Sequence, residues 1–222
     1  MRIAFYGWGF VRELVAEFIG TFALIFIGAG SVVLNAGLVG IAFAHGLVIF
    51  TMATAFGKIS GGHFNPAVSF AAAAIGKLSK EKLVKYVIAQ LFGAVAAGFI
   101  LLILFGNTAN LGTTALGTNV SFASGVAVEA ILTFFLVTVI MNTAVFKNNS
   151  LAPLAIGMTI TLDILFGGPL TGGAMNPARA FGPAFASGFW NDQLVYWIGP
   201  LVGALAAALV SKEMNKSEID KL

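Results

Sequence analysis

Cysteine is absent from this 222-residue sequence, histidine occurs only as His45 and His63, and charged side chains make up 9% of the chain. Without cysteine there is no disulfide and no thiolate metal site. Two histidines also argue against a histidine-rich metal centre, so we expect no metal and no cofactor. So few charges could not coat the surface of a soluble domain. Intrinsic disorder is excluded as well, because it requires low hydrophobicity and high charge.

Hydrophobic residues, in contrast, are abundant. They make up 59% of the chain, with a mean hydropathy of +0.96, against roughly 45–50% in soluble domains. This composition indicates an integral membrane protein whose main surroundings are the lipid bilayer. The net charge of +3 is typical of basic cytoplasmic loops, so we expect no nucleic-acid partner.

Two long stretches carry no Asp, Glu, Lys or Arg. Glu17 and Lys58 enclose 40 such residues, and Lys85 and Glu129 enclose 43. A membrane helix needs about 20 apolar residues, and glycine and asparagine mark breaks within both stretches. Period-2 alternation is missing, which disfavours an outer-membrane barrel. We therefore predict an all-α membrane protein with spans near 10–34, 38–57, 82–105, 123–146, 151–168 and 193–211.

The basic residues predict the orientation. Eleven of the twelve fall at the termini or in the links after the second and fourth spans. They are Arg2, Arg12, Lys58, Lys77, Lys80, Lys82, Lys85, Lys147, Lys212, Lys216 and Lys221. The positive-inside rule then places both termini in the cytoplasm, for a multi-pass protein of the cell membrane. Arg179 is the exception and needs another explanation.

The chain also resembles itself. The segment SGGHFNPA at 60–67 resembles TGGAMNPA at 171–178, an offset of 111 residues, and Glu17 matches Glu129 at an offset of 112. Each half holds three spans, an odd number, so the second half enters the membrane from the opposite side. We expect one domain built from inverted repeats, approximately 1–112 and 113–222, with the functional site at the midplane.

Each repeat contains an Asn-Pro-Ala motif between two spans, Asn65-Pro66-Ala67 and Asn176-Pro177-Ala178. The apolar segments 64–76 and 175–187 are too short to cross a bilayer. Asparagine is a favoured N-cap and proline suits the first helical turn. We therefore predict two re-entrant loops, each followed by a half-helix. One motif alone could be a helix cap without a pore, but two in an inverted repeat favour a pore.

Such half-helices would meet with their N-termini facing at mid-membrane. Each terminus carries roughly +0.5 of an elementary charge, and the two Asn side chains add N–H donors. A water molecule there turns its oxygen toward both amides, which interrupts a proton-conducting chain. The arrangement predicts passive passage of neutral molecules and exclusion of protons and ions. No nucleophile–base pair is visible, so we do not expect an enzyme.

At this point the sequence resembles a known family. ISGGHFNPAVSF and TGGAMNPARAFGPA are similar to the paired signatures of the aquaporin, or major intrinsic protein, family, and the resemblance covers almost the whole chain. It implies six membrane helices, two half-helices, a pore in each subunit and a homotetramer that conducts water and small neutral solutes.

The resemblance also implies a selectivity filter of His45, Ile164, Gly173 and Arg179. This combination resembles the tonoplast type of plant aquaporin, whose members often pass ammonia, urea or hydrogen peroxide besides water. Glycerol facilitators usually have Asp after the filter arginine, where this chain has Ala180. A glycerol or small-polyol facilitator is one alternative, and a coupled secondary transporter, which also uses inverted repeats, is another.

Two candidate filter residues also allow other interpretations. Arg179 is an intramembrane charge and therefore a functional candidate by default, although it could instead pair with Glu129. His45 could form a hydrogen bond between helices.

Other polar residues are expected to support the pore. Glu17 and Glu129 are expected to bind the re-entrant backbones. His63 either lines the pore as a hydrogen-bonding group or responds to pH. Asp163, beside Ile164, would pair with Arg179 or line the outer mouth.

Overall fold

A computed structural model describes the backbone of residues 4–216 and side chains from residue 9 onward, so Arg2 and Lys221 lie outside the described residues. Every regular secondary-structure element in the described part is a helix. Its long helices are α1 (Ala4–Ala23), α3 (Gly37–Ser60), α5 (Lys80–Phe105), α6 (Phe122–Ile140), α7 (Ala152–Thr171) and α9 (Val195–Met214). Shorter ones are η1 (Leu24–Ala29), α2 (Gly30–Val33), α4 (Pro66–Ala74), η2 (Thr108–Gly112), η3 (Met141–Val145) and α8 (Pro177–Ser187).

Six helical segments are long and apolar enough to cross a membrane: Gly9–Val33, Gly37–Ser60, Lys80–Phe105, Phe122–Val145, Ala152–Thr171 and Val195–Met214. The predicted spans agree with these segments to within three residues at every end. The π-helix η1 continues α1 into α2, and η3 extends α6. The predicted all-α membrane architecture is confirmed.

The outer surface of the bundle is apolar, as a bilayer requires. Large hydrophobic side chains such as Phe92, Ile103 and Phe166 are about two-thirds exposed or more. In water these side chains would cost free energy, whereas in hydrocarbon they are matched to their surroundings. Polar side chains such as Glu17, Gln90 and Glu129 are, in contrast, fully buried inside the bundle.

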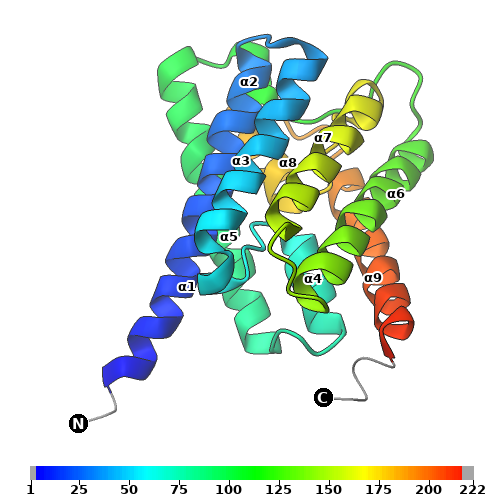
Figure 1. The fold of residues 1–222 in the computed structure, drawn as a ribbon. Coiled ribbons are helices and arrows are strands. Elements are labelled where there is room, and N and C mark those ends of the chain that lie inside the picture. Colours follow the sequence, from blue (N-terminus) through cyan, green and yellow to red (C-terminus); the bar gives the residue numbers. More distant parts are fainter. Residues whose placement is uncertain (1–3, 217–222) are drawn as a thin grey trace.

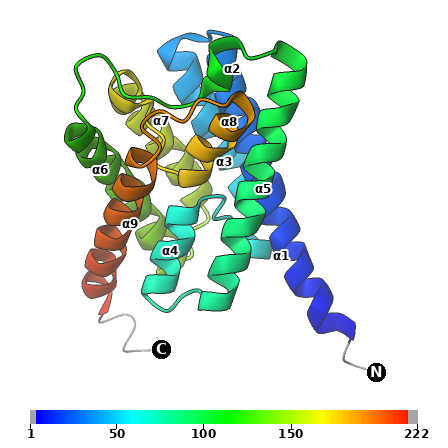
Figure 2. The same ribbon diagram turned by 180° about the vertical axis from the view of Figure 1, so that it is seen from behind.

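Helices α4 and α8 lie in opposite halves of the bundle. In Figures 1 and 2, α1 begins and α9 ends at the lower end, α4 occupies the lower half and α8 the upper half. The spanning helices surround both. This is the inverted arrangement that three spans per repeat predict.

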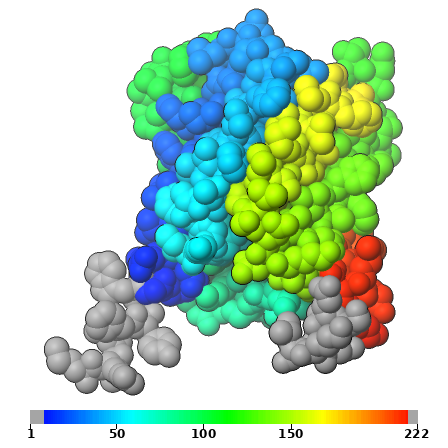
Figure 3. Space-filling model, in the orientation of Figure 1, coloured from blue at the N-terminus to red at the C-terminus, as the bar shows by residue number. Residues whose placement is uncertain are grey.

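Helices α3 and α7 pack closely side by side on one face of the molecule (Figure 3). Two glycines make this possible, because a Cβ added at Gly157 would lie 2.5 Å from the carbonyl oxygen of Gly46. Small residues at such crossings let membrane helices approach closely. This close packing fixes the relative positions of two filter candidates, His45 on α3 and Ile164 on α7.

Both half-helices begin as the sequence predicts. The Asn65 side chain accepts a hydrogen bond from the backbone N–H of Ala67 at 2.8 Å, and Asn176 accepts one from Ala178 at 3.0 Å. Both asparagines have extended backbones, and the prolines that follow occupy the first helical turn. These are ordinary N-caps, and they set where each half-helix starts.

Candidate functional site

A cavity of about 730 Å³ lies between the spanning helices and the two half-helices. Its lining residues run from the link 148–150 between η3 and α7 to Arg179 on α8, the half-helix of the upper half. Its wall takes residues from both repeats, and it includes His45, His63, Asn65, Ile164, Gly173, Asn176 and Arg179. Residues that are far apart in sequence therefore meet around one volume, as a pore requires.

The two asparagine caps meet in the middle of this cavity and hold each other's loops. Asn65 donates from Nδ2 to the carbonyl oxygen of Met175 at 2.8 Å, and Asn176 donates to that of Phe64 at 2.9 Å. Each amide has a second N–H, and both residues line the cavity. One donor of each amide therefore ties the repeats together, and the other remains for a molecule in the cavity.

Glu17 anchors the first re-entrant loop from within the first span. Its Oε1 accepts the Ser60 hydroxyl at 2.6 Å and the His63 backbone N–H at 3.0 Å, and its Oε2 accepts the Phe64 backbone N–H at 2.7 Å. Glu17 is fully buried. Buried non-helical backbone must be paired, so this carboxylate makes the loop tolerable inside a membrane.

Glu129 does the same for the second loop. Its Oε1 accepts the Thr171 hydroxyl at 2.7 Å and the Ala174 N–H at 2.9 Å, and its Oε2 accepts the Met175 N–H at 2.7 Å. These three bonds correspond one to one to the bonds that Glu17 accepts from Ser60, His63 and Phe64. In both repeats, a buried glutamate therefore pairs the backbone N–H groups of the re-entrant loop.

Two tyrosines complete the anchors, and sequence reasoning missed them. Tyr86 donates to the Ser60 carbonyl oxygen at 2.9 Å, and Tyr196 donates to that of Thr171 at 2.8 Å. The tyrosines are 110 residues apart, and Ser60 and Thr171 are 111 apart. The offset of the repeat was the signal that could have found both pairs.

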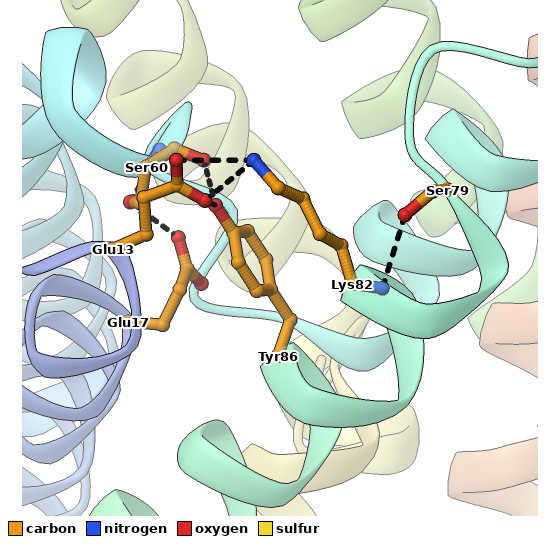
Figure 4. A network of polar contacts seen from close by, with 7 residues as sticks. Glu13, Glu17, Ser60, Ser79, Lys82 and Tyr86 are labelled. Atoms are coloured by element: carbon orange, nitrogen blue, oxygen red, sulfur yellow. Dashed lines mark hydrogen bonds and ion pairs between the residues drawn. The ribbon is translucent and has the colours of Figure 1, made fainter. Parts of the chain in front are cut away.

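The first repeat carries an additional polar network at the lower end of the bundle, shown in Figure 4. Lys82 lies 2.7 Å from a Glu13 carboxylate oxygen, and Tyr86 also contacts Glu13 at 3.0 Å. Glu13 belongs to α1, and Lys82 and Tyr86 belong to α5. The network therefore fastens α1 and α5 to the end of α3 at Ser60.

Phe64 and Met175, which precede the two asparagines, have left-handed backbones with φ of 48° and 51°. Such values are uncommon for bulky residues and store strain that surrounding contacts must offset. The carboxylates of Glu17 and Glu129 supply those contacts at each residue's N–H. The turn directs each residue's carbonyl oxygen toward the opposite asparagine.

Arg179 and His45 form the polar side of the upper cavity, and both are buried. Arg179 donates from Nε to Nε2 of His45 at 3.0 Å, and Nδ1 of His45 lies 2.8 Å from the carbonyl oxygen of Ile41. Because guanidinium nitrogen only donates, His45 Nε2 accepts and its proton sits on Nδ1. Nη1 of Arg179 has no partner among the described residues.

Ile164 and Gly173 form the apolar part of the same region. A Cβ added at Gly173 would lie 3.3 Å from Cα and Cγ1 of Ile164, and the φ of Gly173 is +58°. The loop thus presses directly on α7, and its backbone favours glycine. All four filter candidates line one cavity, although they come from three helices and a loop.

His63 lines the lower part of the cavity and is tied to a polar chain. Its Nδ1 lies 3.0 Å from the Ser69 hydroxyl, and Gln90 donates from Nε2 to that hydroxyl at 3.0 Å. Gln90 also donates to Glu17 at 2.8 Å. The imidazole is therefore linked, through Ser69 and Gln90, to the carboxylate that anchors its own loop.

Of the two roles expected for Asp163, the pairing with Arg179 is wrong, and a place at the outer mouth stays a prediction. Within the described residues it forms no hydrogen bond with Arg179, it does not line the cavity, and its Oδ2 has no partner. It is buried on α7, one residue from Ile164. Successive helix residues point about 100° apart, so Ile164 faces the cavity and Asp163 turns away. Within the described residues Arg179 likewise forms no ion pair with Glu129.

Comparison with known proteins identifies the family to which this chain belongs. Residues 5–211 match the family described as Major intrinsic protein. The chain belongs to that family. It is similar to aquaporin TIP4-4 of Zea mays, with 39% identity covering 91% of this chain and 86% of the relative, and to aquaporin TIP2-1 of Arabidopsis thaliana, with 42% identity covering 90% and 86%.

A solved structure described as the aquaglyceroporin from Plasmodium falciparum shares the fold, with a TM-score of 0.75 and 27% identity, covering 95% of this chain and 97% of that one. The protein is thus a passive transmembrane channel of the major intrinsic protein family, and it is not an enzyme.

Proposed function

We propose that this channel conducts water and small neutral solutes, with ammonia, urea and hydrogen peroxide as its solute class, through a tonoplast-type filter of His45, Ile164, Gly173 and Arg179. One observation carries the proposal. Four residues named by family spacing line one cavity, and Arg179 is hydrogen-bonded to His45 within it. The similarity to two TIP aquaporins supports it.

The chemistry of the wall explains this solute class. Nη1 of Arg179 and the asparagine amides offer donors to an oxygen or a nitrogen lone pair. Ile164 makes one position of the wall apolar, and Gly173 adds no side chain at another. The opening therefore has room for molecules larger than water. The positive guanidinium and the two half-helix N-termini repel cations and oppose proton transfer.

In this proposal His63 and the acids have supporting roles. Glu17 and Glu129 hold the re-entrant loops, and His63 offers a hydrogen-bonding group to molecules in the lower cavity. We further propose that the channel is a multi-pass protein of the cell membrane and a homotetramer. The lower end, with Lys58 and Lys147 at its links, would then be cytoplasmic, and both termini would lie there.

A glycerol or small-polyol facilitator is the second candidate. The similarity to the Plasmodium falciparum structure favours it, because that protein is described as an aquaglyceroporin. Ala180 follows Arg179 here, where glycerol facilitators usually have Asp. A proton-coupled transporter is less well supported, since no Asp or Glu of the described residues lines the cavity.

Stopped-flow light scattering on proteoliposomes tests these alternatives side by side. Vesicles with the protein should exceed protein-free vesicles in permeability to water, ammonia and urea, and glycerol should gain least. Glycerol gaining as much as urea would establish the facilitator instead. Flux that requires a proton gradient, or that saturates at low solute concentration, would establish a transporter.

A further inference from the structure

The first span is irregular where it passes His45. Leu24–Ala29 forms the π-helix η1, while the flanking turns of α1 and α2 are α-helical. Single π-turns within α-helices are rare and occur frequently at functional sites. Gly28 lies in this turn, and its carbonyl oxygen accepts the Ser31 hydroxyl at 2.6 Å. Gly28 does not line the cavity, whereas His45 does.

Gly28 leaves space that the imidazole fills. A Cβ added there would lie 2.5 Å from Cδ2, 2.6 Å from Nε2 and 2.9 Å from Cε1 of His45. Such distances are far below van der Waals contact, so a methyl group would force the ring to move. The ring has little freedom, because Nδ1 is held by the Ile41 carbonyl oxygen and Nε2 accepts from Arg179.

From this geometry we infer that Gly28 is a positioning residue for selectivity. Its missing side chain lets His45 sit back against the first span, where Nε2 holds the Arg179 guanidinium at the cavity wall. The inference rests on the proposed filter. Gly28 acts through His45 and touches no solute itself. A methyl group at position 28 would push the ring into the opening and lengthen the bond to Arg179, which narrows the passage for larger solutes first.

The test is the ratio of urea to water permeability in proteoliposomes of Gly28→Ala. We expect this ratio to fall at least about fivefold, the factor that corresponds to the loss of one hydrogen bond of ordinary net strength. Gly9→Ala is the matched control, because it lies in the same span and an added Cβ there meets nothing within 4 Å. Its ratio should equal that of the wild type.

The double variant Gly28→Ala/His45→Ala separates positioning from general damage. Without the ring there is room for the methyl group, so Gly28→Ala should change nothing in the His45→Ala background. A ratio unchanged in the single variant, or lowered again in that background, would overturn the inference. If Gly28→Ala does not yield monodisperse protein, removing the ring should restore it, and failure of the double variant to fold would also count against the inference.

Failure of the proposed function gives a different result. Wild-type vesicles would then be no faster than protein-free vesicles for water and urea, and both proposals would fall together. Normal wild-type flux with an unaltered Gly28→Ala ratio would remove the positioning role alone.

Discussion

The two repeats of this channel share a scaffold but differ in the side chains that they present to the cavity. Glu17, Ser60 and Tyr86 hold the lower loop, and Glu129, Thr171 and Tyr196 hold the upper loop through the same bonds. At an offset of 111 residues, however, Val68 stands for Arg179, Ala53 for Ile164 and Ile156 for His45. All six of these positions line the cavity.

This comparison indicates that two different requirements act on the molecule. The membrane requires the buried hydrogen bonds that hold the re-entrant loops, whereas the solute determines which side chains line the cavity. Unpaired backbone in a bilayer costs several kcal/mol per group, so both loops need a buried acceptor. No such penalty dictates which side chains face a water-filled cavity. The matched lining positions could therefore diverge, so that Val68 in the first repeat corresponds to Arg179 in the second, and Ile156 in the second corresponds to His45 in the first.

The largest expected effect comes from breaking the shared scaffold. Glu129→Ala leaves the backbone N–H groups of Ala174 and Met175 unpaired and removes the shortest hydrogen bond of the Thr171 hydroxyl, at a cost of about 3 kcal/mol or more. Glu17→Ala should cost at least as much, since it also removes the hydrogen bond that Gln90 donates to Glu17. Thermal unfolding in detergent measures both. The exposed Glu213→Ala is the control, and Glu129→Ala as stable as this control would contradict the shared scaffold.

Arg179→Val makes the upper half resemble the lower half, where Val68 occupies the matching position. We expect urea and glycerol permeability to rise about tenfold relative to water, and methylammonium to enter, because the repelling charge is gone. Water flux should persist. Val68→Ala is the matched control and should leave cation exclusion intact. Solute selection that is identical in Arg179→Val and the wild type would mean that Arg179 does not act on the solute.

His45→Phe should have a smaller effect. The larger ring narrows the opening and removes the acceptor of the Arg179 Nε bond, so ammonia flux should fall about threefold more than water flux. Stopped-flow assays with a pH-sensitive dye measure ammonia, and light scattering measures water. Ile156→Leu, a change of similar volume at the counterpart position, should leave the ratio unchanged. An equal loss of both fluxes in His45→Phe would count against a filter role.

The smallest effect is expected at the polar network of Glu13, Lys82 and Tyr86, which has no counterpart among the described residues of the second repeat. Lys82→Met removes the ion pair with Glu13, whose side chains are 41% and 20% exposed, so the loss should be about 1 kcal/mol or less. Unfolding midpoints at low and high salt measure it, and the difference from wild type should shrink as salt rises. A loss above about 2 kcal/mol would show that the pair belongs to the scaffold itself.

Much of the fold could be predicted because membrane constraints act locally on the sequence. Uncharged stretches, basic links and the matched Asn-Pro-Ala segments were enough for six spans and two half-helices. The caps at Asn65 and Asn176 followed from short-range chemistry. The boundaries of the repeats near 112 and 113 stay a prediction, and so do the filter roles.

Other features depend on contacts between distant segments and could not be predicted. Asp163 adjoins the filter candidate Ile164 in sequence, but successive helix residues point in different directions, and Asp163 does not line the cavity. Nothing in the sequence distinguishes Gly28 from other glycines of the apolar spans, whereas the structure places the His45 ring directly against it. Sequence spacing does not reveal which side chain fills which gap.

The sequence by itself predicted six membrane-spanning helices and two matching halves of opposite orientation, because hydropathy, charge and cap residues depend directly on the surrounding solvent and the local backbone. Only the tertiary structure decided that Arg179 is hydrogen-bonded to His45, that each asparagine donates to the opposite loop, and that Gly28 makes room for the imidazole. Those contacts join residues up to 134 positions apart, and their geometry exists only once the helices have packed.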